Sequence, residues 1–169
     1  MTNKIVNSAV RDIFNSGNYN ITTLDDEISA DNNCKQLLKQ YHQYLLINKE
    51  ILPLLAGSMA SGADYYLRDY MIDKCRSNIF AISPDMIRSF AGNWYIISTL
   101  EPNIAELKDI LAGVSEFYGF CAERKMIDPT VATTVAEACT DDVFYQQRIE
   151  SFNEITGDGF IAWNSSCPL

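Results

Sequence analysis

The chain has 169 residues, of which 47% are apolar and 21% charged, a composition typical of a folded globular protein and not of a disordered acidic tail. A domain of this length can bury roughly 70% of the surface that its unfolded chain exposes, so neither disulfides nor metals are needed for stability. Thirteen Lys and Arg against 22 Asp and Glu leave a net charge of −9, which disfavours binding to nucleic-acid phosphates and to anionic membranes.

The N-terminal third predicts two helices separated by a polar connector. Residues 3–15 carry apolar side chains at helical spacing and predict a short amphipathic helix. Residues 18–33 are polar and contain an acidic run, so we expect a connector that holds one turn of helix at most. From Asn33 the helical period strengthens and predicts a central helix, which Pro53 must end or kink because proline lacks a backbone donor.

The central helix is expected to bury a wide face. Two neighbouring rows of apolar side chains follow it at helical spacing. The rows are Leu37, Tyr41, Tyr44, Ile51 and Leu55, and beside them Leu38, Leu45 and Leu52. The pattern therefore predicts that the apolar side chains as far as Leu55 face the core.

Five further helices are expected after a flexible segment at residues 57–62. Each begins at a residue whose side chain can cap a helix, and in two of them a proline stands at the first helical position. The starts are Ser61, Ser83-Pro84, Asn103 with Glu106, Asp128-Pro129 and Thr140-Asp141-Asp142. Gly157 ends the last of these helices.

The C-terminal tail, residues 157–169, contains the apolar run Phe160 to Trp163. Because apolar terminal segments usually pack on their own domain, we expect this tail to dock on the helices; the alternative is a tail that binds a partner. The chain contains no internal repeat and no low-complexity linker. Residues 1–169 are therefore expected to form a single all-α domain, a bundle of six or seven helices.

The stretch from Leu67 to Ala138 carries a resemblance. It combines an aromatic-rich helix, a Ser-Pro start and the sequence VSEFYGFCAERKM at residues 114–126, followed by Ile127-Asp128-Pro129. This stretch resembles helical modules of poorly characterised bacterial proteins, in which a long F-x-x-F helix ends in a short charged turn. The resemblance covers less than half of the chain, implies an all-helical fold and carries no catalytic residue across.

Motifs for catalysis and for cofactors are absent from the sequence. His42 is the only imidazole and has no nucleophile motif beside it, so we interpret it as a histidine at the edge of the apolar stripe. There is no glycine-rich phosphate loop and no Glu-x-x-His pair. Tyr70 and Lys74 have the spacing of short-chain dehydrogenases, but no dinucleotide-binding turn accompanies them. We therefore expect no catalytic, cofactor-binding or metal-binding residues.

The cysteines and the N-terminal residues indicate in which cellular compartment the protein resides. Five cysteines form an odd set without a C-x-x-C pair, and in a domain of this size we expect them to be reduced thiols. Residues 1–17 mix charged and polar side chains with apolar ones, so no secretory signal is expected. Together these features predict a cytoplasmic protein.

The acidic excess is concentrated in the last quarter of the chain. Residues 126–169 contain one basic and seven acidic residues, a net charge of −6, whereas residues 1–60 and 61–125 carry −1 and −2. Such a patch can steer a basic protein partner. The candidate partner surface consists of Asp141, Asp142, Glu150, Glu154, Phe160 and Trp163. The first hypothesis is therefore a small acidic, non-enzymatic binding or regulatory domain, with a protein partner and neither nucleic acid nor membrane.

Two alternatives stay open. Four aromatic residues from three of the expected helices, Tyr66, Tyr70, Trp94 and Tyr118, predict a candidate pocket between helices for a small apolar or aromatic ligand, either in a binding protein or in an unorthodox enzyme. The other alternative is a homodimer in which the two copies exchange the tail at residues 160–163.

Overall fold

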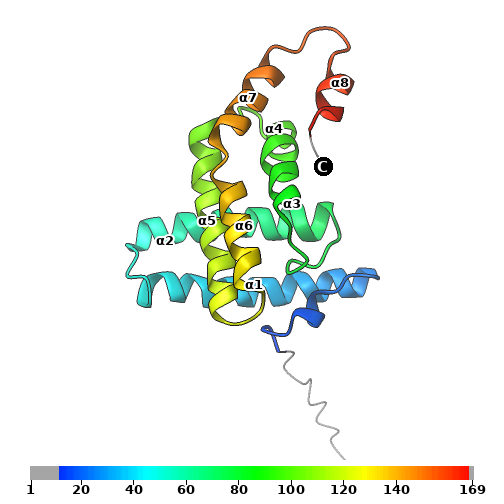
Figure 1. Cartoon of the computed structure of the whole chain (residues 1–169). Helices are drawn as coiled ribbons and strands as arrows, with labels where there is room; N and C mark the ends of the chain where they lie inside the picture. The colour runs from blue at the N-terminus through cyan, green and yellow to red at the C-terminus, as the bar shows by residue number, and fades with distance from the viewer. Residues whose placement is uncertain (1–11, 168–169) are drawn as a thin grey trace, which may run out of the picture.

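The structure is a computed structural model that describes residues 12–167 (Figure 1). Most of the helix expected over residues 3–15 lies outside the described residues. Its last part, residues 12–15, forms a turn in which the Asn15 N–H donates to the Asp12 carbonyl at 3.1 Å.

The fold is all-α, as predicted, and residues 12–167 contain no strand. The elements are η1 (Ser16–Tyr19, a 3₁₀ turn), α1 (Leu24–Ile47), α2 (Pro53–Asp64), η2 (Tyr65–Lys74, π-helical), α3 (Pro84–Ser89), η3 (Phe90–Trp94, π-helical), α4 (Tyr95–Ser98), α5 (Ile104–Glu123), α6 (Pro129–Cys139), α7 (Asp142–Asn153) and α8 (Phe160–Ser165). Because α2 continues into η2, and α3, η3 and α4 form one rod, the described part contains seven continuous helices besides the 3₁₀ turn.

The helices form a hairpin and a group of helices that cross it. The helix α1 and the α2–η2 rod are antiparallel neighbours, which lie horizontally in Figure 1. The helices α5 and α6 and the α3–α4 rod stand upright across this hairpin, and α2 and α5 contact each other extensively. The helices α7 and α8 extend beyond the upright group at the end remote from α1. One core of buried aliphatic and aromatic side chains connects the two groups.

The helix α1 begins nine residues before the predicted start at Asn33, so most of the expected connector at residues 18–33 is helical. A capping box starts it: the Asp26 N–H donates to Thr23 Oγ1 at 3.1 Å, and the Asp26 carboxylate accepts from the Thr23 N–H at 3.0 Å. These bonds, with two more from Thr22, lower the pKa of Asp26 to about 2. The polar character of this stretch comes from its exposed side, whereas Ala30 is fully buried.

The segment at residues 57–62, expected to be flexible, lies inside α2, which starts with Pro53 at its first position and not at Ser61. Gly62 of this segment is needed for contact between helices, not for flexibility. A Cβ on Gly62 would lie 2.8 Å from the Ile110 Cα, and in α5 a Cβ on Gly113 would lie 2.2 Å from a backbone oxygen of α2. The two backbones therefore touch where α2 crosses α5.

The other predicted starts agree with the structure. The helix α3 begins at Pro84, directly after Ser83. The Asn103 side chain accepts from the Glu106 N–H at 2.8 Å and caps α5. The Asp128 carboxylate accepts from the Thr130 N–H at 2.8 Å and caps α6. Local capping signals therefore located these helices correctly.

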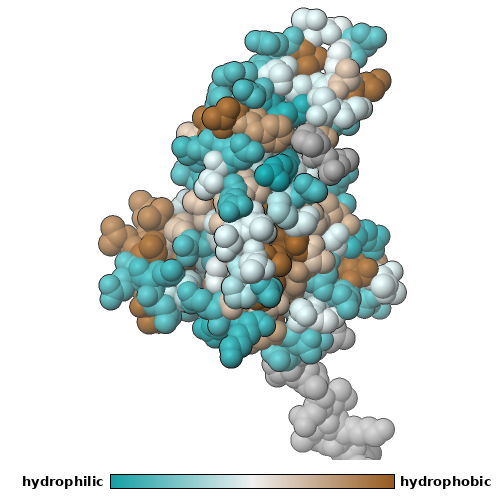
Figure 2. All heavy atoms as spheres, in the orientation of Figure 1, coloured by the Kyte–Doolittle hydropathy of each residue, from teal (hydrophilic) through white to brown (hydrophobic). Residues whose placement is uncertain are grey.

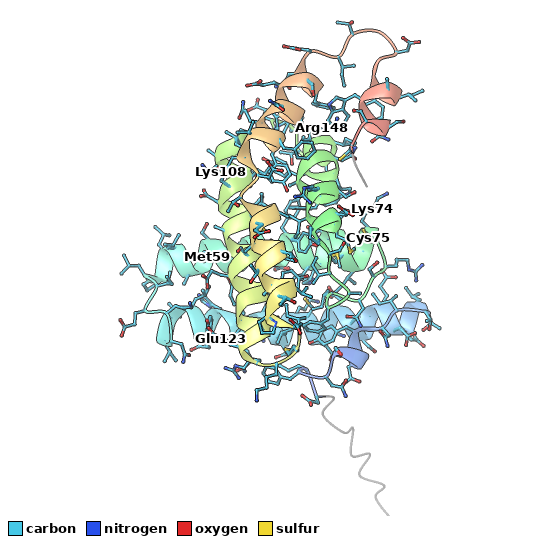
Figure 3. The ribbon with its side chains drawn as sticks, in the orientation of Figure 1. Met59, Lys74, Cys75, Lys108, Glu123 and Arg148 are labelled. Atoms are coloured by element: carbon cyan, nitrogen blue, oxygen red, sulfur yellow. The ribbon has the colours of Figure 1, made fainter. Side chains whose placement is uncertain are left out.

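The C-terminal tail docks on the helices, as expected, in the form of α8. The Trp163 side chain is 7% exposed, and its indole N–H donates to Ser151 Oγ at 3.0 Å. The Arg148 guanidinium of α7 lies 3.9 Å from the centroid of the Trp163 ring and donates to the Trp163 carbonyl at 3.1 Å (Figure 3). Ile161, in contrast, remains exposed on the outside of the helix.

Candidate functional site

The four aromatic residues of the predicted ligand pocket do come together. The Tyr70 and Trp94 ring centroids are 5.4 Å apart, those of Tyr66 and Tyr70 5.7 Å, and those of Tyr66 and Tyr118 6.3 Å. Tyr66 and Tyr70 belong to η2, and Trp94 ends η3, so the two π-helical segments face each other across these rings. The rings of Tyr66, Tyr70 and Trp94 also contact Phe90.

This aromatic cluster is part of the packed core of the protein. Tyr66 and Tyr118 are fully buried, and none of the four residues borders the five surface pockets of 350–440 Å³ that lie elsewhere on the molecule. The Tyr118 hydroxyl donates to the Ile79 carbonyl at 2.7 Å, whereas the Tyr66 hydroxyl has no hydrogen-bond partner among residues 12–167. Burial raises the pKa of both hydroxyls well above the ordinary value for tyrosine, so both remain protonated.

The acidic part of the predicted partner surface is partly neutralised by basic side chains. Asp142 lies 3.1 Å from the Lys108 ammonium, and Asp141 lies 3.8 Å from the Arg88 guanidinium. Both cations come from elements that precede residue 126, which is why the charge of the C-terminal quarter alone overstates the local negative charge. This carboxylate pair is therefore a weaker attractant for a basic partner than the sequence indicated.

The remaining four residues of that predicted surface differ in their exposure. Trp163 is buried beneath Arg148 and is not available to a partner. Phe160 is partly exposed and stacks on Trp163 with 6.2 Å between the ring centroids. Glu150 accepts from the Gln146 side chain at 2.7 Å, and Glu154 lies just beyond the end of α7.

The largest exposed apolar group lies where the sequence predicted buried residues. Ile47, Leu52, Leu54 and Leu55 are 69%, 75%, 90% and 54% exposed, and we call these four residues the apolar tip. They gather at the turn between α1 and α2, where Figure 2 shows a brown patch at the left edge of the molecule.

The turn explains why this prediction was wrong. The helix α1 ends at Ile47, and Glu50 adopts a left-handed backbone conformation with φ 52°, which reverses the chain before Pro53 starts α2. Leu52 and Leu55 therefore do not continue the stripe of α1. The apolar residues of the predicted stripe belong to two different helices, α1 and α2. Hydrophobic periodicity alone does not distinguish two such helices from one long helix.

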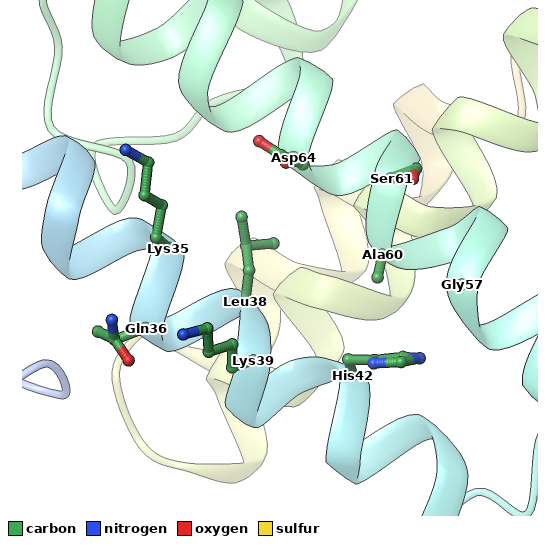
Figure 4. Close-up of a pocket in the computed structure, with 9 residues that line it drawn as sticks. All are labelled: Lys35, Gln36, Leu38, Lys39, His42, Gly57, Ala60, Ser61 and Asp64. Atoms are coloured by element: carbon green, nitrogen blue, oxygen red, sulfur yellow. The ribbon is translucent and has the colours of Figure 1, made fainter.

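An open groove with a volume of about 420 Å³ lies between α1 and α2. Its α1 wall carries Lys35, Lys39 and His42, which lie four and three residues apart on one side of the helix (Figure 4). Leu38 lies between the helices. The α2 wall consists mainly of small residues, Gly57, Ala60 and Ser61, and ends at Asp64.

Ion pairs compensate the charges at one end of this groove. Asp64 lies 3.1 Å from the Arg68 guanidinium, which also contacts Asp31 at 2.7 Å, and Asp31 pairs with Lys35 at 3.0 Å. These two carboxylates and two cations balance one another. Lys39 and His42 form no ion pair or side-chain hydrogen bond with any other residue of the described range, so the groove retains an uncompensated positive charge at Lys39.

Residues 12–167 contain neither a group of metal ligands nor a membrane-spanning helix. Within this range no three His, Cys, Asp or Glu side chains are placed to hold a metal ion together. None of its helices combines the length and apolar character that crossing a membrane requires. Comparison of the whole chain with models of protein families, with curated proteins and with solved structures finds no match.

Proposed function

We propose that this protein is a non-enzymatic binding domain that docks on a protein partner through the apolar tip. The observation that supports the proposal is the exposure of four large aliphatic side chains, between 54% and 90%, at a single turn. Exposed apolar groups of this kind, unlike isolated ones, mark protein-binding surfaces. Because burying one leucine or isoleucine contributes roughly 1.5–3 kcal/mol, the tip can supply the central contact of an interface.

The charges favour a partner of neutral or basic character over a second copy of the chain. Two copies, each with a net charge of −9, repel each other on approach. At the tip itself the charges of Lys49 and Glu50 offset each other, and Lys49 also lies 3.8 Å from Glu116 of α5. The partner therefore meets an apolar surface with little local charge, on a molecule that attracts cations from a distance.

Site-specific photo-crosslinking in the cells that make the protein tests this proposal. A photoreactive benzophenone side chain replaces Leu54, and in a matched control it replaces Leu100, which is 99% exposed and lies outside the tip. We expect one discrete adduct with a different protein at position 54 and none at position 100. An adduct between two copies of this chain, or no adduct at position 54, would contradict the proposal.

We also propose a cytoplasmic location, supported by the cysteines. All five are free thiols, and Cys75 is the one with intermediate exposure, whereas the other four are buried. A reducing compartment keeps such an unpaired thiol reduced. A membrane-permeable maleimide, added to intact cells to alkylate free thiols, should label Cys75 quantitatively. A fully oxidised Cys75 that escapes labelling would contradict this location.

A further inference from the structure

Gly57 has no structural reason to be a glycine. A Cβ built on it meets no atom within 4 Å, and its backbone conformation is one that any residue adopts. In the same helix Gly62 is required, because its Cβ would collide with the Ile110 backbone. A glycine within a helix makes the helix less stable than alanine does, because glycine loses more backbone freedom on folding. Gly57 therefore weakens α2 without serving its packing, and what the missing side chain provides is open space in the wall of the groove.

The α1 wall of the groove carries the two basic side chains Lys39 and His42. Lys39 and His42 lie three residues apart on α1, and in Figure 4 the His42 ring points towards the side of Ala60 and Gly57 whereas the Lys39 ammonium points the other way, towards Gln36. The ion pairs of Lys35 and Asp64 lie at the other end of the groove. A lysine side chain reaches across such a groove by rotation about its four methylene carbons, and the His42 ring offers an N–H donor.

We propose that the groove between α1 and α2 binds a small organic anion. Its acid group pairs with Lys39 and His42, and its apolar part lies on Leu38, Ala60 and the bare backbone of Gly57. The volume of about 420 Å³ lies within the range of small-molecule sites. The apolar floor selects against an inorganic anion, and the net charge of −9 selects against a polyanion such as a nucleic acid.

Titration of the ¹⁵N-labelled chain with octanoate tests this inference, with octanamide as a neutral probe of the same shape and inorganic phosphate as an anion without an apolar body. We expect saturable shifts of the amide resonances of residues 35–42 and 57–64, and affinities at least tenfold lower for octanamide and for phosphate. Equal affinity for octanamide, or shifts confined to other residues, would overturn the inference.

Two substitutions locate the site. Gly57→Leu fills the groove, and Lys39→Met removes the uncompensated charge; each should lower octanoate affinity at least tenfold. Gly119→Leu on α5, where a Cβ also meets nothing within 4 Å, and Lys74→Met on η2 are matched controls and should bind as the unmodified chain does. The melting temperature of Gly57→Leu should not fall, so a loss of binding is not a loss of fold. Full binding by Gly57→Leu would overturn the inference.

Discussion

Gly113 of α5 lies so close to Met59 of α2 that a Cβ on the glycine would stand 2.2 Å from the Met59 carbonyl oxygen. In Figure 3 Met59 lies where α2 passes α5. The Tyr41 hydroxyl of α1 donates to the Gly113 carbonyl at 2.8 Å, so the same residue ties both arms of the hairpin to α5. Gly62 makes the second close approach, to Ile110. This crossing fixes the hairpin, with its groove and apolar tip, on the rest of the molecule.

Two glycine-to-alanine substitutions within helices should have opposite effects. Gly113→Ala places a methyl group against backbone that cannot rotate away, and should lower the free energy of unfolding by about 1–3 kcal/mol or more. Gly57→Ala meets no neighbour and should raise it by about 0.5–1 kcal/mol. Urea unfolding followed by circular dichroism measures both changes in the free energy of unfolding. Changes of the same sign in the two variants would contradict the close contact between α2 and α5 at Gly113.

Two buried tyrosines should also respond differently to loss of the hydroxyl. The Tyr66 hydroxyl is buried without a partner in the part of the chain that the structure describes, so Tyr66→Phe should stabilise the protein by about 1 kcal/mol or more. The Tyr118 hydroxyl donates to the Ile79 carbonyl, so Tyr118→Phe should cost about 1 kcal/mol. The comparison uses unfolding midpoints in urea. A destabilised Tyr66→Phe would show that this hydroxyl has a partner after all.

The capping box of α1 predicts a dependence on pH. Hydrogen bonds from Thr22 and Thr23 lower the pKa of Asp26 from its ordinary value of 3.8 to about 2, so the carboxylate form stabilises the folded state. This stabilisation is present above pH 4 and is lost as the pH falls towards 2. Asp26→Asn should therefore be less stable than the unmodified chain at pH 7, with a difference that shrinks between pH 4 and pH 2.

Asp25→Asn is the control for this measurement, because Asp25 makes no side-chain hydrogen bond in the described part of the chain. Its difference from the unmodified chain should stay small throughout the pH range. A difference for Asp26→Asn that does not change between pH 4 and pH 2 would rule out the capping role.

Arg148 should hold the C-terminal helix in place. Its side chain is buried and donates to the Gly92 carbonyl at 2.8 Å and to the Trp163 carbonyl at 3.1 Å, and among residues 12–167 no carboxylate pairs with it. Burial lowers its pKa, although the guanidinium remains charged at neutral pH. Arg148→Met removes the buried charged donor that joins the Gly92 and Trp163 carbonyls, and should cost about 1.5–3 kcal/mol.

Hydrogen exchange distinguishes this role from general destabilisation. In Arg148→Met the amides of residues 160–166 should exchange much faster than those of α5. Arg76→Met removes a more exposed ion pair with Glu27 and should leave the exchange of residues 160–166 unchanged. Slow exchange of α8 in Arg148→Met would mean that other contacts hold the tail.

Local signals in the sequence predicted the helix starts at Ser83-Pro84, Asn103 and Asp128, because capping depends on residues close together in the chain. The glycines of α2 could not be interpreted in this way. Whether Gly62 permits flexibility or a close helix crossing depends on the Ile110 backbone of α5, which is distant in the sequence. The two π-helical segments, η2 and η3, were not predicted from the sequence.

The candidate sites were harder to predict than the helices, for a related reason. Tyr66, Tyr70, Trp94 and Tyr118 were correctly expected to share one region, but spacing does not tell whether rings enclose a cavity or fill it. The apolar tip was missed because its residues match the period of α1 across a chain reversal. Pro53 is the sequence signal of that reversal, whereas the left-handed conformation of Glu50 is visible only in the structure.

The elution of the chain in size-exclusion chromatography, from extracts of the cells that make it, tests the docking role of the apolar tip most directly. Leu54→Asp and Leu100→Asp form a matched pair, since both residues are at least 90% exposed and only the first belongs to the tip. We predict that the unmodified chain and Leu100→Asp elute earlier than the purified chain, in a complex, and that Leu54→Asp elutes with the purified chain. Equal elution of all three with the purified chain, or of Leu54→Asp with the complex, would contradict the account.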